Sequence, residues 1–133
     1  MKKTDLKKFQ ETVDDVLIRH VSILDVVTKL QESGAKVNRS TIKTITSCGC
    51  IKLNTTSLDK KVPSDMDYEE LKNYKLTHTD GDVCPVCKEK IEQEIGNHLF
   101  YLSALCNHFN LDLEDILDKE YNRISTLGKF SLY

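Results

Sequence analysis

Four of the five cysteines in this 133-residue chain form two tight pairs, Cys48-Gly49-Cys50 and Cys84-Pro85-Val86-Cys87. Thiolate sulfur is a preferred ligand of Zn²⁺, which takes four ligands in a tetrahedron in structural sites. The Cys-x-x-Cys spacing of the second pair is typical of a zinc knuckle, and Gly49 would let the backbone turn between Cys48 and Cys50. The sequence therefore predicts one structural zinc site with Cys48, Cys50, Cys84 and Cys87 as its ligands.

Two other interpretations of the cysteines remain open. A Cys-x-x-Cys pair at a helix N-terminus has its thiolates stabilised by the helix dipole, which would suit a thiol redox sensor. The βαβ context that thioredoxin-type motifs need is missing. In the second interpretation, the cysteines bind no metal and do no redox chemistry, and are simply small buried residues. His78 is a candidate substitute ligand, whereas Cys106, on the apolar face of a predicted helix, is expected to be a core thiol.

The elements that must position these residues are predicted to be helices. The chain has 5 glycines and 2 prolines, which favours long helices over many short strands. Apolar residues at alternating steps of three and four predict one long helix from Asp5 to Ser33, capped by Gly34, with His20 as a core or interface histidine.

The rest of the chain is predicted to continue as helices, with an extended piece at Ile51–Leu53. The last two helices are expected to form an antiparallel hairpin, because the connection between them is short. The expected helices cover residues 40–47, 64 to about 74, 88–109, and about 112–127.

The fold class expected is all-α: a single domain over residues 1–133, built as a bundle of about four to five helices. The apolar stripe of the first predicted helix is longer than one small core can cover. We therefore expect a homodimer in which helices pack across the two chains.

Composition excludes several classes of protein. Apolar residues are 39% and charged residues 30%, a normal globular balance. Lysine plus arginine is 19 and aspartate plus glutamate is 21, so the net charge of −2 argues against a dedicated nucleic-acid binder. No run approaches the roughly 20 apolar residues of a membrane span, and the N-terminus lacks a signal-peptide core. We expect a cytoplasmic protein with no membrane or nucleic-acid partner.

A segment near the C-terminus resembles a known family. The residues from Glu94-Ile95-Gly96-Asn97 through Leu99-Phe100-Tyr101-Leu102 to Asp112-Leu113-Glu114-Asp115 resemble the second half of the MazG-like all-α nucleoside triphosphate pyrophosphohydrolases. The shared pattern is a Glu-x-x-Asp motif on a helix, a Leu-x-Tyr-Leu run, a short turn and an acidic helix start. The resemblance covers about a quarter of the chain and implies a helical fold that assembles into dimers or higher oligomers.

The same resemblance implies what chemistry to look for. In that family, carboxylates of two Glu-x-x-(Glu/Asp) motifs hold magnesium on nucleotide phosphates, and a metal-activated water attacks phosphorus. Here Glu94 matches the first acid, Asn97 replaces the second, and residues 40–47, where the other motif should lie, contain no acid.

We therefore expect a catalytically degenerate MazG-like domain with a structural zinc site, acting as a binding or regulatory module. The alternative is an active, magnesium-dependent pyrophosphohydrolase with a nucleotide ligand and Glu94 and Asn97 as catalytic candidates. The second alternative is the thiol redox sensor.

Overall fold

The computed structural model describes residues 3–54, 67, 69 and 77–128, and these are mainly helical. The described elements are α1 (Leu6–Val16), α2 (Ile23–Lys43), the π-helical turn η1 (Thr44–Cys48), β1 (Lys52–Leu53), β2 (Thr79–Asp80), α4 (Pro85–His108) and α5 (Leu113–Leu127). The all-α prediction is confirmed for these residues. None of the described helices combines the length and the apolar character that crossing a lipid bilayer requires.

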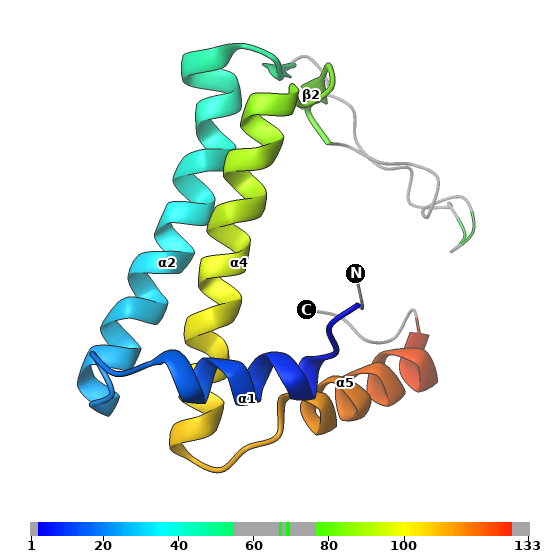
Figure 1. Ribbon diagram of the computed structural model, residues 1–133. Coiled ribbons are helices and arrows are strands. Elements are labelled where there is room, and N and C mark those ends of the chain that lie inside the picture. The colour runs from blue at the N-terminus through cyan, green and yellow to red at the C-terminus, as the bar shows by residue number, and fades with distance from the viewer. Residues whose placement is uncertain (1–2, 55–66, 68, 70–76, 129–133) are drawn as a thin grey trace.

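The two longest helices, α2 and α4, run side by side in opposite directions (Figure 1). The buried residues between them are mostly small, including Ser33 and Ser40 of α2 and Ser103 and Ala104 of α4. The hydroxyls of Ser33 and Ser40 donate to the carbonyls of Leu30 and Val37 at 2.9 and 2.8 Å, so their own helix satisfies them. Small, internally satisfied side chains let two helices approach closely.

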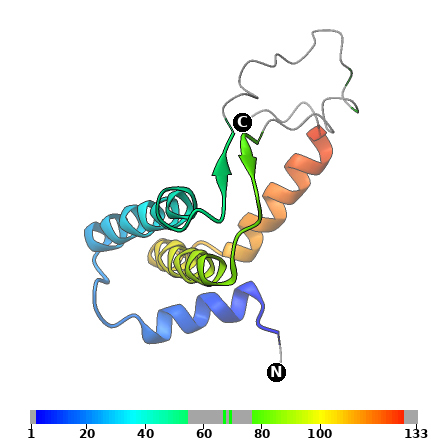
Figure 2. The same cartoon turned by 90° about the horizontal axis from the view of Figure 1, so that it is seen from above.

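Helix α1 crosses α4 near the C-terminal end of α4 (Figure 1), and the view along the helix pair shows α1 running across one side of it (Figure 2). The apolar core lies at this end, where Val13, Val26 and Ala104 are buried against one another. Four partly buried apolar side chains pack around them: Phe9, Leu17, Phe100 and Leu105.

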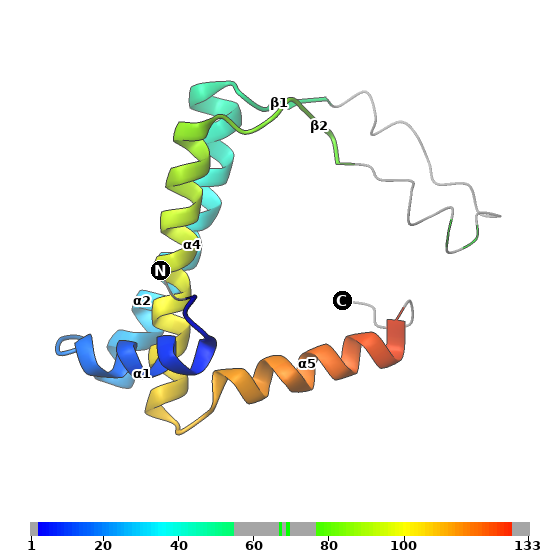
Figure 3. The same cartoon turned by 45° about the vertical axis from the view of Figure 1, so that its right-hand side comes forward.

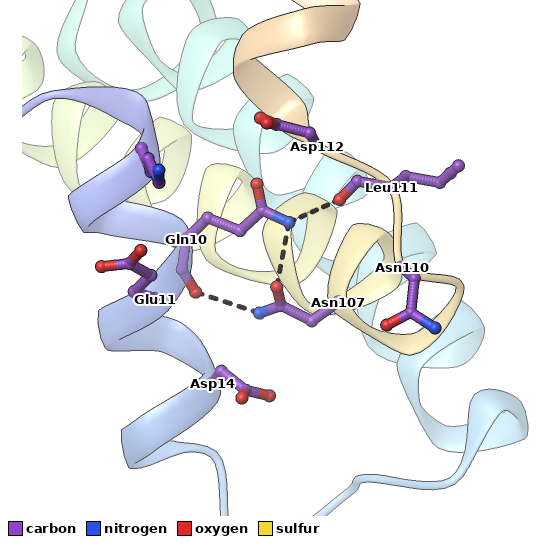
Figure 4. A pocket seen from close by; sticks show the side chains of 8 residues that line it. Gln10, Glu11, Asp14, Asn107, Asn110, Leu111 and Asp112 are labelled. Carbon is purple, nitrogen blue, oxygen red and sulfur yellow. Dashed lines mark hydrogen bonds between the residues drawn. The ribbon is translucent and has the colours of Figure 1, made fainter.

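A hydrogen-bonded side-chain pair attaches α1 to the turn between α4 and α5 (Figure 4). The Gln10 amide donates to Asn107 Oδ1 at 2.9 Å and to the Leu111 carbonyl at 2.7 Å. Gln10 Oε1 accepts from the backbone N–H of Leu113 at 2.9 Å, and Asn107 Nδ2 donates to the Gln10 carbonyl at 3.0 Å. One glutamine thus fixes where α5 begins.

The prediction of a single long first helix is wrong. The chain leaves helical geometry after Val16, passes through His20 with a φ of 57°, and starts again at Ile23 with Ser22 as N-cap. His20 is exposed in this break, with Nδ1 3.6 Å from Asp25. Gly34 is not a cap but lies within α2, where an added Cβ would come 3.3 Å from His98 Cε1.

Other boundaries also differ from the prediction. The helix expected over 40–47 is the end of α2 followed by η1, and the helix expected from Lys88 already starts at Pro85. Helix α5 does not fold back along α4 but leaves it at a wide angle and contacts α1 (Figure 3). The extended piece at Ile51–Leu53 is confirmed as β1, whereas the predicted helix from Ser64 to about Tyr74 lies outside the described residues apart from Asp67 and Glu69.

Candidate metal centre

The first cysteine pair is shaped by the π-helical turn that ends α2. The wider turn leaves the carbonyl of Thr44 free to accept from the backbone N–H of Gly49 at 2.8 Å and of Ile51 at 3.3 Å. Gly49 has a φ of 78°, in the left-handed region that favours glycine. The predicted role of Gly49 is confirmed, because this residue turns the backbone between Cys48 and Cys50.

The second pair sits at the start of α4. Cys84 is the N-cap and Pro85 takes the first helical position, where its missing N–H costs nothing. The backbone N–H of Cys87 donates to the sulfur of Cys84 at 3.4 Å. The Cys-x-x-Cys spacing therefore places both sulfurs at the positive end of the helix dipole.

A short antiparallel sheet brings the two pairs together. Lys52 of β1 lies opposite Asp80 of β2, and Leu53 lies opposite Thr79, so the chain returns to the first pair before α4 begins. Gly81 follows β2 with a φ of 100°, and a Cβ there would lie 2.5 Å from the carbonyl oxygen of Cys50. A side chain at this position would push the Cys50 loop away.

The four sulfurs converge on one point. The sulfur atoms of Cys48, Cys50, Cys84 and Cys87 all lie within 4.8 Å of one another, and those of Cys48 and Cys84 are 3.7 Å apart. A tetrahedral zinc–sulfur centre with bonds of about 2.3 Å places its sulfurs about 3.8 Å apart. All five cysteines are free thiols. The donor set and its spacing therefore fit a metal ion that prefers sulfur in a tetrahedron.

The thiols of the cysteine cluster differ in pKa. The backbone N–H of Cys87, aimed at the sulfur of Cys84, lowers the pKa of Cys84 to about 7. A hydrogen bond of the Cys87 thiol to the Cys84 side chain raises the pKa of Cys87 to about 12, because it stabilises the protonated thiol. A divalent cation between the sulfurs would stabilise their charged forms and hold all four as thiolates.

The other residues singled out from the sequence lie elsewhere. His78 is not among the converging ligand atoms. Cys106 is buried, as predicted, and burial raises the pKa of its thiol. Glu94 is half-buried and pairs with Lys90 at 2.8 Å, whereas Asn97 is exposed. The assignment of Glu94 and Asn97 as magnesium ligands stays a prediction.

Sequence reasoning missed several residues around the centre. Thr44 supports the cysteine loop through its backbone carbonyl, and a backbone contact leaves no trace in residue type. Gly81 leaves room for the Cys50 carbonyl, and the glycine itself was the signal of that close approach. Farther along α4, the half-buried His98 places its Nδ1 2.9 Å from the hydroxyl of Ser33. The sequence signal for close packing on this face of α2 is the spacing of Ser33 and Ser40, two small polar residues two helical turns apart.

Within the described ranges, the four cysteines are the one group of three or more His, Cys, Asp or Glu side chains whose ligand atoms meet. Comparison of the chain with protein-family models, with curated proteins and with solved structures gave no match.

Proposed function

We propose that the protein is a helical module stabilised by a structural zinc ion, and that it binds a ligand or partner and performs no catalysis of its own. The observation that carries this proposal is the convergence of four sulfurs within 4.8 Å at the junction of η1, the sheet and α4. Four protein thiolates complete a tetrahedron and leave no open position for substrate, which is typical of structural zinc.

The position of the cysteines in the fold supports a structural role. The buried apolar residues lie at the α1 end of the α2–α4 pair, whereas the buried residues of α2 and η1 at the cysteine end are the polar Ser40 and Thr44. The cysteine end therefore has little hydrophobic burial in the described residues to hold it. A metal that binds only the folded arrangement stabilises that end instead.

The non-catalytic proposal is preferred to a magnesium-dependent pyrophosphohydrolase of MazG-like type. Glu94 is paired with a lysine, and Asn97 is neutral and exposed. In the described part of the chain, Glu94 belongs to no group of three or more metal-ligating side chains whose ligand atoms lie close together. A MazG-like origin of the helical arrangement is proposed on the resemblance of residues 94–115 alone.

The module is further proposed to be a homodimer. Several large apolar side chains around the break between α1 and α2 face solvent: Val16, Ile18, Val21, Leu24 and Val27 are 50–82% exposed. Such a patch is typical of a protein interface.

The proposal is tested by measuring zinc in protein purified without a polyhistidine tag, by mass spectrometry of the metal. We expect one zinc per chain, with Cys84→Ser losing zinc and melting at a lower temperature. Cys106→Ala removes a buried thiol outside the cluster and should keep its zinc, even if its cavity lowers the melting temperature.

Two outcomes would contradict the zinc proposal. Unaltered protein that carries no metal and forms a reversible disulfide between the pairs would favour the redox sensor. Full zinc occupancy in Cys84→Ser would show that the metal is bound elsewhere.

A further inference from the structure

A pocket of about 410 Å³ opens between α2 and α4 beside the cysteines. Cys48 and Cys87 form part of its wall, and Val86, which is 77% exposed, adds an apolar edge. Four cationic side chains line it: Lys36, Arg39 and Lys43 from α2, and Lys90 from α4. Among the described residues that line it, Glu94 is the only acidic one.

The sequence explains why the cations gather here. Lys36, Arg39 and Lys43 are spaced three and four residues apart, so one face of α2 carries all three. Helix α4 runs antiparallel beside that face and contributes Lys90 from the opposite side. Like charges held this close repel one another, and this repulsion is relieved when an anion binds between them.

Two of the four cations have acidic neighbours and two do not. Lys36 pairs with Glu32 at 3.1 Å and Lys90 with Glu94 at 2.8 Å. For Arg39 and Lys43, residues 3–54, 67, 69 and 77–128 provide no carboxylate within ion-pair distance. Arg39 and Lys43 are therefore the side chains available to an anionic ligand.

The metal centre accounts for part of this positive charge. A zinc ion with four thiolates carries a net charge of −2, which nearby lysines and arginines stabilise. With Glu94 and this centre, the four cations of the lining sum to a charge of +1, and Glu32, which pairs with Lys36 from outside the lining, offsets it. What favours an anion here is the placement of Arg39 and Lys43, which have no carboxylate partner among the described residues, and not the net charge of the pocket.

We propose that this pocket binds the phosphate group of a small phosphorylated molecule. Arg39 offers planar, paired N–H donors that match phosphate oxygens, and Lys43 adds a second charge suited to a dianion rather than to a carboxylate. The volume falls within the range of small-molecule sites, and Val86 can contact the non-phosphate part of the ligand. The net charge of −2 on the whole chain disfavours a nucleic-acid backbone as the ligand.

This inference rests on the proposed function in one respect, since zinc-bound Cys48 and Cys87 form one wall of the pocket. The experiment therefore uses the full chain with its zinc content measured first. Inorganic phosphate, adenosine monophosphate, adenosine and a single-stranded oligonucleotide are each titrated in a calorimeter at low chloride concentration. We expect one site per chain for phosphate and for adenosine monophosphate, and no heat of binding for adenosine.

The variant Arg39→Ala/Lys43→Ala should keep its zinc and weaken phosphate binding at least tenfold. The matched control Lys8→Ala/Lys119→Ala removes the same charge from exposed positions on α1 and α5, and should bind phosphate like the unaltered protein. Arg39→Lys should retain part of the affinity, because the charge remains while the paired donors are lost.

Three results would overturn the inference. Zinc-loaded protein that binds neither phosphate nor adenosine monophosphate would remove the site while leaving the zinc proposal intact. Equal affinity in Arg39→Ala/Lys43→Ala and the unaltered protein would place the anion elsewhere. Binding of the oligonucleotide alone would identify a nucleic-acid surface in place of a small-molecule pocket.

Discussion

Two glycines control whether the four sulfurs can meet. Gly49 turns the chain between Cys48 and Cys50, and Gly81 lies so close to Cys50 that a Cβ would stand 2.5 Å from its carbonyl oxygen. Both have a positive φ, yet a Cβ at Gly49 would find no atom within 4 Å. Alanine adds backbone strain at both positions but displaces Cys50 only at Gly81, so comparing the two variants isolates the effect of moving Cys50.

We expect Gly81→Ala to lower the zinc content and the melting temperature together. Gly49→Ala should cost about 1 kcal/mol of unfolding free energy through backbone strain and retain its zinc. Metal analysis and thermal unfolding of the two variants decide this. Equal zinc content in both would show that the Cys50 loop can move without loss of the metal.

Helices α2 and α4 pack through small polar side chains whose hydrogen bonding differs from one residue to the next. The Ser33 hydroxyl donates to the Leu30 carbonyl and lies 2.9 Å from His98 Nδ1. Ser103 is fully buried, and its hydroxyl oxygen has no hydrogen-bond partner among the described atoms. A buried serine thus stabilises the helix pair at position 33 and destabilises it at position 103.

We expect Ser103→Ala to raise the free energy of unfolding by about 1 kcal/mol, because it removes a buried, unsatisfied hydroxyl. Ser33→Ala should lower it by about 1–2 kcal/mol, because His98 loses its partner in a part-buried site. Chemical denaturation of the two variants measures both changes. A loss of stability in Ser103→Ala would mean that its hydroxyl has a partner after all.

The same elements show which parts of the fold the sequence could predict. Cysteine spacing identified four side chains that do converge, because ligand number and residue type are written directly in the sequence. The break between α1 and α2 could not be predicted, since apolar residues continue at helical spacing through Leu17–Ser22 and neither glycine nor proline interrupts them. The crossing of α1 over α4 needs that break, and this tertiary requirement overrides the periodicity.

The direction of α5 also could not be predicted from the local sequence. A short connection favours a hairpin, but Gln10 of α1 binds Asn107, Leu111 and the first backbone N–H of α5. A contact across about a hundred residues of chain decides the angle. No pattern within the last two helices contains that information.

At the scale of the whole molecule, the apolar core and the cysteine cluster lie at opposite ends of the α2–α4 pair. The apolar core lies where α1 crosses the helix pair, and the cysteine centre lies at the other end. Apolar side chains between α1 and α2 remain exposed, with Ile18 at 82% and Leu24 at 78%. Exposed leucine and isoleucine on one side of a small molecule favour a second copy of the chain as the cover.

We therefore expect sedimentation equilibrium at tens of micromolar to give twice the 15.2 kDa mass of one chain. Leu24→Asp should shift the protein to monomer, because burying an unpaired carboxylate in an apolar interface is costly. Leu24 is mostly exposed within one chain, so this change tests the interface and not the core. Gln93→Asp adds the same charge at an exposed position of α4 and should leave the dimer intact. A single-chain mass for the unaltered protein would contradict the dimer and leave the apolar side chains of α1 and α2 to a different partner.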